Sequence, residues 1–220
     1  INAADLPEPS RGTIQLEMLA LDAGGNEARR ALPNASVLIG KRVPIPITTT
    51  GNPVGLDEQK LRDVPLLWIH GRTDFSWSDV ERKVLAQYIR NGGMVLASAI
   101  CGSEAFADAF RREMALVMPD APLASMPPNH PALTNAFGGF NVATVSIRTP
   151  AGRGASKGIS RRASPPMIEV ASVDGITSVF FSPLDISCAL ESQNSVQCPG
   201  YSTDDADKIV ANLVLYAMQQ

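Results

Sequence analysis

Two continuous apolar segments, separated by an amphipathic one, lie in the middle of the chain. Residues 65–71 (PLLWIHG) and 94–100 (MVLASAI) contain almost no charged side chain, which is typical of strands buried on both faces of a parallel sheet. Between them, residues 76–93 (SWSDVERKVLAQYIRNGG) place apolar side chains at helical spacing, with Ser76 as the expected N-cap and Gly92 at the end. This order predicts two adjacent parallel strands in the middle of a sheet, joined by a right-handed crossover helix.

The helical pattern resumes after the second of these strands. Phe106, Phe110, Met114 and Val117 repeat at helical spacing, and Pro119 marks the end of the element. Alternating strands and helices are the arrangement of a parallel sheet with helices packed on it. The pattern therefore predicts an α/β fold, a three-layer sandwich around a mainly parallel central sheet.

Elements outside this centre are predicted from shorter patterns. Residues 13–25 are expected to form a strand, residues 26–42 a helix that lasts only until Pro33, and residues 43–55 a short edge strand, because prolines remove ladder donors. The remaining expected elements are strands at 141–148, 167–172 and 176–182 and a last helix at 202–220, capped by Ser202 or Thr203.

The remaining segments add no second domain. Residues 1–12 contain two prolines and no periodicity, and are expected to form an extended arm before a single α/β domain of residues 13–220. Within that domain, a loop at about 149–166 is rich in Gly, Ser and Arg, and five basic residues lie from Arg148 to Arg162. Such a segment either clamps an anionic group or remains a solvated loop, and the second is the commoner use of this composition.

Composition and charge narrow the class of function. The 220 residues are 45% hydrophobic and 19% charged, with a formal net charge of −3. This balance argues against a general phosphate-binding surface, so we expect no nucleic-acid partner. No apolar run approaches the roughly 20 residues that cross a bilayer, so we expect no transmembrane segment. The chain starts at Ile1 without a methionine, as expected of either a processed protein or a domain excised from a longer one.

The three cysteines suggest a compartment. Cys188 and Cys198 bracket a polar loop, CALESQNSVQC, and we expect a disulfide between them. Such a bridge favours the periplasm or the cell surface, and the alternative is two unpaired thiols in a cytoplasmic protein. The chain has no C-x-x-C or H-x-x-x-H pair, so we predict no metal site. No cofactor is predicted either.

Candidate binding residues gather where the predicted strands end. Because ligands collect at the carboxyl ends of strands in doubly wound sheets, His70 and Cys101 are expected to share one edge. The turn after Cys101 would point the N–H groups of Gly102 and Ser103 outward at a helix N-terminus, which suits an anion. The expected ligand-binding residues are His70, Arg72, Cys101, Gly102, Ser103, Glu104, His130 and Asp185.

Cys101 has two possible roles. As a nucleophile it needs a base held by an orienting group, and the candidates are His70 and His130. As a structural residue it is simply a small side chain in a tight turn between strand and helix. The structural role is favoured, because His130 lies between Pro128 and Pro131 in a rigid loop, where a histidine more often closes a structural hydrogen bond.

The later two thirds of the chain also resemble a known family. The stretches that carry the resemblance are YIRNGGMVLASAICGSEAFADAFRREM, PPNHPAL, GITSVFFSPLDISCALE and DADKIVANLVLYAM. Over residues of about 60–220 they are similar to a bacterial family known only as a domain of unknown function, family 4159. The glycine pair, FRREM, HP, the stretch from Asp185 to Glu191 and the Asn before LYA are its most specific features.

This resemblance implies a fold and a location. Members of the family resemble the class I glutamine amidotransferase and trehalose-utilisation-like flavodoxin folds, and they often form the C-terminal end of larger envelope proteins. The family has no established reaction. The amidotransferase elbow is G-x-C-x-G, followed later by H-x-E, whereas this chain has AICGS and HPA.

Two functions from different classes are therefore expected. The favoured one is a non-catalytic cell-envelope domain that binds a protein partner or a small polar ligand at the carboxyl edge of its sheet. It rests on the fold and the family resemblance. The alternative is a cysteine hydrolase or amidotransferase-like enzyme that uses Cys101, with His70 or His130 as the base.

Overall fold

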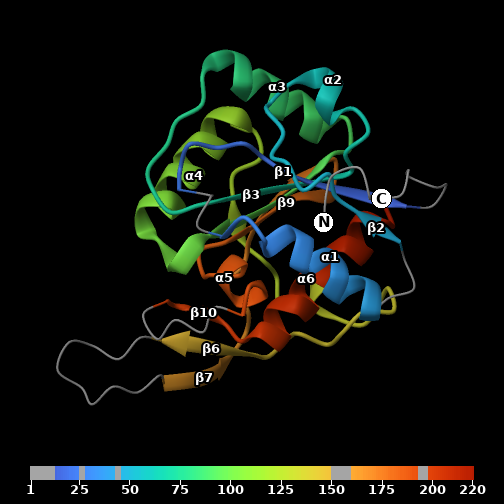
Figure 1. The fold of residues 1–220 in the computed structure, drawn as a ribbon. Coiled ribbons are helices and arrows are strands. Elements are labelled where there is room, and N and C mark those ends of the chain that lie inside the picture. Colours follow the sequence, from blue (N-terminus) through green and yellow to red (C-terminus); the bar gives the residue numbers. More distant parts are fainter. Residues whose placement is uncertain (1–12, 25–27, 43–45, 150–159, 193–197) are drawn as a thin grey trace.

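A seven-stranded sheet runs through the computed structural model, which describes residues 13–24, 28–42, 46–149, 160–192 and 198–220 (Figure 1). The strand order is β2-β1-β3-β4-β9-β8-β5. β8 pairs antiparallel with β9, and β5 pairs antiparallel with β8. The other neighbours are parallel. The bounds are β1 (Ile14–Met18), β2 (Ile47–Thr48), β3 (Leu66–Gly71), β4 (Met94–Ala99), β5 (Ala124–Ser125), β8 (Glu169–Val173) and β9 (Ile176–Ser182).

The two apolar segments of the sequence are neighbours in the middle of this sheet. β3 and β4 are parallel, with Leu66 opposite Met94 and Gly71 opposite Ala99. Every residue of both strands is buried. The predicted central pair of parallel strands is confirmed.

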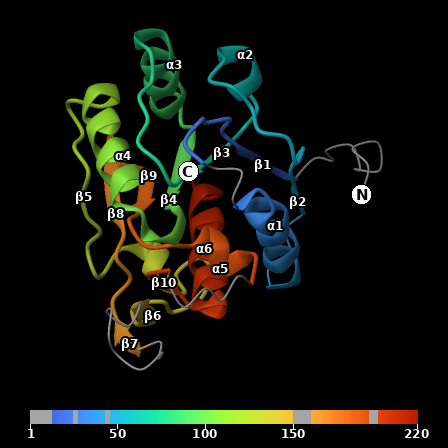
Figure 2. The same ribbon diagram turned by 60° about the vertical axis from the view of Figure 1, so that its left-hand side comes forward.

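Helices cover both faces of the sheet and complete three layers (Figure 1 and Figure 2). In β3, Leu67 and Ile69 belong to the core on one face, whereas Leu66 and Trp68 belong to the core on the other. This alternation arises because successive side chains of a strand point to opposite faces. The first core is shared with α2 (Glu58–Leu61), α3 (Asp79–Arg90) and α4 (Glu104–Val117), the second with α1 (Ala31–Arg42), α5 (Ser187–Leu190) and α6 (Thr203–Ala217).

Local sequence explains where the long helices begin and end. α3 starts at a capping box in which Ser78 and Glu81 exchange hydrogen bonds, so the predicted cap at Ser76 is wrong by two residues. Its end is confirmed at Gly92, which has a left-handed φ of 94°. In α4 the predicted apolar stripe is buried, and in α6 the cap is Ser202.

Pro33 does not interrupt a helix, as the sequence had suggested. α1 begins at Ala31, so Pro33 lies in its first turn. The first N–H groups of a helix have no intrahelical acceptor, and a proline there costs no hydrogen bond. The predicted edge strand is confirmed as β2, while residues 43–45 lie outside the described part of the chain.

A second, three-stranded antiparallel sheet lies beside α5 and the start of α6 (Figure 1). Its order is β10-β6-β7, from β6 (Val145–Thr149), β7 (Ser160–Ser164) and β10 (Gly200–Tyr201). The predicted strand at 141–148 therefore forms, but outside the main sheet. The predicted loop at 149–166 is partly strand, and residues 150–159, like the predicted arm at 1–12, are outside the described residues.

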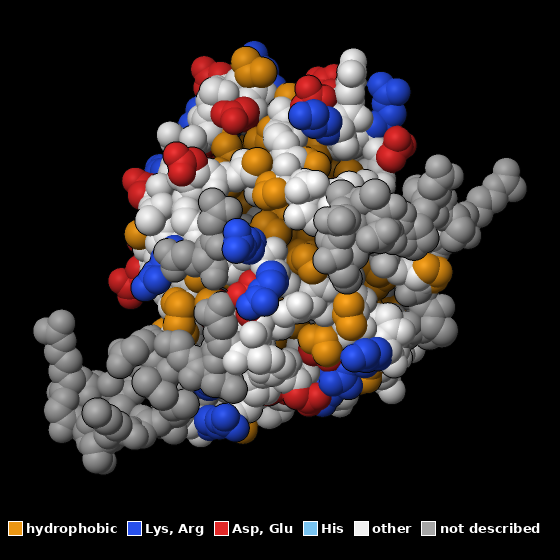
Figure 3. Space-filling view, in the orientation of Figure 1, with side chains coloured by type: hydrophobic (Ala, Val, Ile, Leu, Met, Phe, Trp, Pro, Cys, Tyr) orange, Lys and Arg blue, Asp and Glu red, His pale blue; other side chains and the backbone are white. Residues whose placement is uncertain are grey.

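The surface of the protein carries charges of both signs (Figure 3). Acidic and basic side chains are interspersed over the face shown in Figure 3. Among the described residues, none of the helices combines the length and the apolar character needed to cross a membrane.

Candidate functional site

The carboxyl ends of three neighbouring strands meet at one edge of the main sheet. His70, near the end of β3, is opposite Ser98 of β4, and Ser98 is opposite Ser182 at the end of β9. The loops that follow β4 and β9 carry Cys101 and Asp185. Residues separated by more than 80 positions therefore come together at this edge, as the βαβ order predicts.

The turn after β4 has an unusual backbone. Cys101 and Gly102 both have left-handed φ angles, 53° and 62°, and the conformation is uncommon for a residue with a side chain. Ser103 then caps α4: its Oγ accepts from the backbone N–H of Phe106 and donates to the carbonyl oxygen of Arg72 at 2.5 Å. The predicted helix N-terminus is present. The hydroxyl group of Ser103 links the loop after β4 to the loop after β3.

Asp185 lies at the centre of the residues that gather at the carboxyl ends of these strands. It is fully buried, and its Oδ1 accepts the backbone N–H groups of Cys101 at 3.1 Å and Cys188 at 3.2 Å. Its Oδ2 lies 3.9 Å from Nη2 of Arg148. Burial raises the pKa of Asp185, and the two N–H groups and the Arg148 charge oppose that rise.

Arg148 was not among the predicted binding residues, although it is the first of the five basic residues in the segment up to Arg162. It is 2% exposed, and its Nε, Nη1 and Nη2 have no hydrogen-bond partner among the described residues. Gly200 lies against both partners, because a Cβ there would lie 3.4 Å from Nη2 of Arg148 and 2.9 Å from Cβ of Asp185. An Arg at the end of the strand pattern VSIR is the signal that could have singled it out.

The disulfide joins different cysteines from the predicted pair. Cys101 is bonded to Cys198, and Cys188 is a free, buried thiol. Burial, with Asp185 nearby, raises the pKa of the Cys188 thiol to about 12. The predicted bridge between Cys188 and Cys198 is therefore wrong, although a bridge is still compatible with a location outside the cytoplasm.

Backbone pairing around Asp185 explains the change of partner. The N–H of Asp185 donates to the carbonyl oxygen of Pro199 at 3.1 Å, and the N–H of Tyr201 donates to the carbonyl oxygen of Asp185 at 3.2 Å. The segment that begins at Cys198 thus runs beside residue 185 and reaches the turn after β4. Closeness along the sequence favoured Cys188, but this strand-like pairing favours Cys101.

His70 and His130, the two candidate bases, have structural partners. His70 is buried, with Nδ1 2.9 Å from Oγ of Ser187 in α5. His130 accepts the N–H of Ala132 through Nδ1 and lies 3.0 Å from Oγ1 of Thr177 through Nε2. This pattern requires the neutral ring with the proton on Nε2, and burial lowers the pKa of His130.

His130 also lies at the opposite end of the sheet. Thr177 is the second residue of β9, whose parallel pairing with β4 places it at the amino ends of the strands. The aromatic neighbours of His130 are Phe180 and Tyr216. The expectation that His130 shares the edge with Cys101 is therefore wrong, because the HP loop packs under α6 and not beside the β4 turn.

The predicted residues at the edge differ in exposure and in chemistry. Arg72 and Glu104 are exposed, whereas Gly102 and Ser103 are partly exposed. In the bridged form, Cys101 has no thiol to act as a nucleophile, so the hydrolase alternative stays a prediction that first requires its reduction. Among the described residues, no group of three His, Cys, Asp or Glu side chains is arranged to hold a metal ion.

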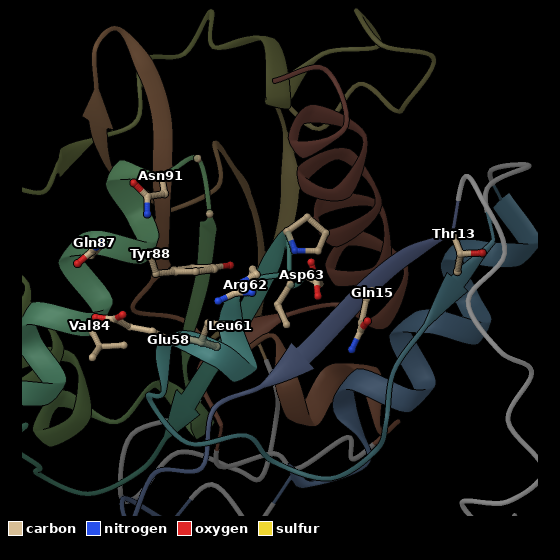
Figure 4. Close-up of a pocket in the computed structure, with 14 residues that line it drawn as sticks. Thr13, Gln15, Glu58, Leu61, Arg62, Asp63, Val84, Gln87, Tyr88 and Asn91 are labelled. Carbon is tan, nitrogen blue, oxygen red and sulfur yellow. The ribbon is translucent and has the colours of Figure 1, made fainter.

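A cavity of about 920 Å³ lies at the other end of the main sheet. Figure 4 shows side chains from β1, from α2 and the turn after it, and from α3 around this space, with Gln15, Arg62 and Tyr88 among them. It opens near the amino ends of β1, β3 and β4. No residue of the predicted site lines it.

No curated protein matches this chain. A solved structure described as "mmIFT52 N-terminal domain" is similar at 18% sequence identity and a TM-score of 0.33, with 74% of this chain and 69% of that chain covered. The family model described as "Domain of unknown function (DUF4159)" matches residues 15–218, and the chain therefore belongs to that family.

Proposed function

We propose that this protein is a non-catalytic binding domain of the cell envelope, which takes a small polar ligand with an anionic group at the carboxyl edge of its main sheet. The observation that carries the proposal is the buried guanidinium of Arg148, whose three nitrogens have no hydrogen-bond acceptor among the described residues. The flavodoxin-like or amidotransferase-like relationship and the location in the envelope are parts of the same proposal. They draw on the family resemblance and on the Cys101–Cys198 bridge.

Unsatisfied donors are what make Arg148 unusual. Buried polar groups in folded proteins are nearly always hydrogen-bonded, and a buried charge without partners is costly. Among the described residues, the charged group nearest to Arg148 is Asp185 at 3.9 Å, which is too long for a hydrogen bond. The planar guanidinium has five N–H donors in a fork that matches the oxygens of a carboxylate or a phosphate. The donors of Arg148 are therefore matched to an oxyanion.

A second cation faces the same place. Arg161 of β7 is directly opposite Arg148 of β6 in the antiparallel pair, so both side chains leave the same face of the small sheet. Like charges directly opposite one another are destabilising. Arg161 is exposed, and an anion bound between the two guanidinium groups would neutralise both. The alternation of the strand directs Arg162, the next residue, to the other face.

Access to Arg148 requires a local opening. The side chain is covered on one side by Gly200 of β10, a strand of two residues that pairs with β6 at only two positions. Such short pairing opens at lower free energy than the long strands of the core. We therefore expect slow association that is limited by this opening.

The test is calorimetric titration of the full chain with acetate, succinate and inorganic phosphate at constant ionic strength. We expect at least one of these anions to bind, and the Arg161→Gln variant to weaken that binding at least about tenfold, since a charge-assisted hydrogen bond is worth roughly 1.5–3 kcal/mol. Arg162→Gln is the matched control, because it removes the same charge from the same strand on the opposite face.

Two results would contradict the proposal. One is that none of the three anions binds. The other is an equal loss in Arg161→Gln and Arg162→Gln, which would indicate general electrostatic attraction and not a site at Arg148.

A further inference from the structure

We propose that the three cysteines form a thiol–disulfide exchange centre, in which Cys188 displaces Cys198 from its bond to Cys101. The Cys188 thiolate attacks Sγ of Cys101, the bond between Cys101 and Cys198 breaks, and the electron pair leaves on the sulfur of Cys198, which then takes up a proton. One disulfide and one thiol are present before and after the step. The exchange needs no oxidant and no reductant.

Geometry places the attacking sulfur beside its target. Sγ of Cys188 lies 3.9 Å from Sγ of Cys101. The two backbones are held at one atom, because Oδ1 of Asp185 accepts the N–H groups of both residues. The third sulfur is therefore positioned by the same buried carboxylate that shapes the turn after β4.

The lengths of the closed loops do not choose between the two pairings. The Cys101–Cys198 bridge joins residues 97 positions apart, and a Cys101–Cys188 bridge would join residues 87 positions apart. Loop-closure entropy depends on the logarithm of this length, so the two states differ very little in that respect. Local packing then sets the balance, and both pairings are accessible from one fold.

The surroundings of Cys188 make the exchange slow at neutral pH. Burial disfavours its thiolate, and the charges of Asp185 and Glu191 add to that effect. The other charged or titratable groups here are Arg148, which faces Asp185, and His70, which contacts Ser187 beside Cys188. Because the thiolate is the attacking species, the rate is expected to rise about tenfold per pH unit as long as the pH stays well below the thiol pKa.

The exchange changes which element is tied to the turn after β4. In the present pairing the tie runs to Cys198, just before β10. After exchange it runs to α5, and β10 retains only its hydrogen bonds. This inference does not depend on the proposed ligand, since it concerns only the three sulfurs.

The test is disulfide mapping of the full chain without reductant. Samples held at pH 7 and at pH 9 are quenched in acid, alkylated with N-ethylmaleimide under denaturing conditions and analysed by mass spectrometry. Trypsin leaves Cys188 and Cys198 in one peptide, because no Lys or Arg lies between residues 163 and 207, so a protease that cleaves after Glu191 is needed as well. We expect the label to move from Cys188 to Cys198 with time, faster at pH 9 and at a rate independent of protein concentration.

Two variants complete the experiment. Cys188→Ser has no third thiol, so it should take up no label at either pH and keep the Cys101–Cys198 bridge. Cys198→Ser, treated with oxidised glutathione, should form a Cys101–Cys188 bridge. The proposal is overturned if the label stays on Cys188 at both pH values, if Cys188 is found bonded to Cys198, or if Cys101 and Cys188 remain separate in Cys198→Ser.

Discussion

Two buried polar clusters, one at each end of the main sheet, differ in how completely they are hydrogen-bonded. At the amino end, Asn212 of α6 accepts the N–H of Phe140 and donates to the carbonyl oxygens of Ala132 and Phe140, at 2.7–3.0 Å. At the carboxyl end, within the described part of the chain, Arg148 has only the distant charge of Asp185. A buried cluster in which every polar group is hydrogen-bonded stabilises the fold, whereas a cluster with donors that lack an acceptor is suited to bind a ligand.

The family motifs fall mainly on the structural side of this comparison. The HP motif and the Asn before LYA contribute His130 and Asn212 to the amino-end cluster. Glu113 of the FRREM motif is buried between α3 and α4, where its carboxylate accepts hydrogen bonds from Nε of Arg82 and from the backbone N–H of Trp77. Arg111 of the same motif pairs with Glu169 of β8. In this chain these residues hold the layers together, so they point to a fold more directly than to a site.

Asn212→Ala is expected to be the most destabilising change. The variant leaves buried carbonyl and N–H groups in the HP loop without partners, and we expect a loss of about 3 kcal/mol or more in the free energy of unfolding. Chemical denaturation measures it. Asn135→Ala, at an exposed position in the same loop region, is the control, with an expected change within about 0.5 kcal/mol.

A smaller effect is expected at the carboxyl end, although the groups there are charged. The double variant Arg148→Met with Asp185→Asn removes both charges and keeps a side-chain oxygen for the N–H groups of Cys101 and Cys188. Replacing a buried ion pair by groups of similar volume is often neutral or stabilising, so we expect a change within about 1 kcal/mol, or a gain. A loss as large as that of Asn212→Ala would show that the two clusters are alike.

The smallest expected effect is the pH dependence of the amino-end cluster. Burial lowers the pKa of His130 below its ordinary 6.5, so the unfolded chain binds a proton more readily than the folded one. The stability contribution of His130 is therefore complete above pH 6.5 and is lost as the pH falls through the folded pKa. His130→Asn, which keeps an acceptor for Ala132, should give a flatter stability profile between pH 7.5 and 5.5 in denaturant titrations. An unchanged slope would assign the pH dependence to other groups.

The spacing of apolar residues predicted the fold well. It shows which face of a strand or helix is buried, and it can be read from residues a few positions apart. The β3–β4 pair and the apolar stripe of α4 followed from strand and helix spacing alone. Pro33 misled because a proline ends a helix or sits in its first turn, and only the position of the preceding N-terminus decides which.

The site was harder to predict because it depends on contacts between distant segments. Cys188 and Cys198 are close in sequence, but the pairing of residues 185 and 200 brings Cys198 to Cys101. His130 was placed at the wrong end because the sequence does not show under which helix its loop packs. The sequence does not distinguish Arg148 from the other basic residues of its segment, and the composition of that segment predicts that they are exposed to solvent.

The Cys101–Cys198 bridge also sets how far the chain can be extended by a mechanical force. It encloses α4, β5, β6 to β9 and α5, and residues 97 positions apart are joined at one covalent point. A fully extended residue spans roughly 3.4 Å, so the bridge withholds about 330 Å of contour length from a pull on the two ends. Exchange to Cys188 would return ten of those positions, about 35 Å, which is a length that single-molecule extension resolves.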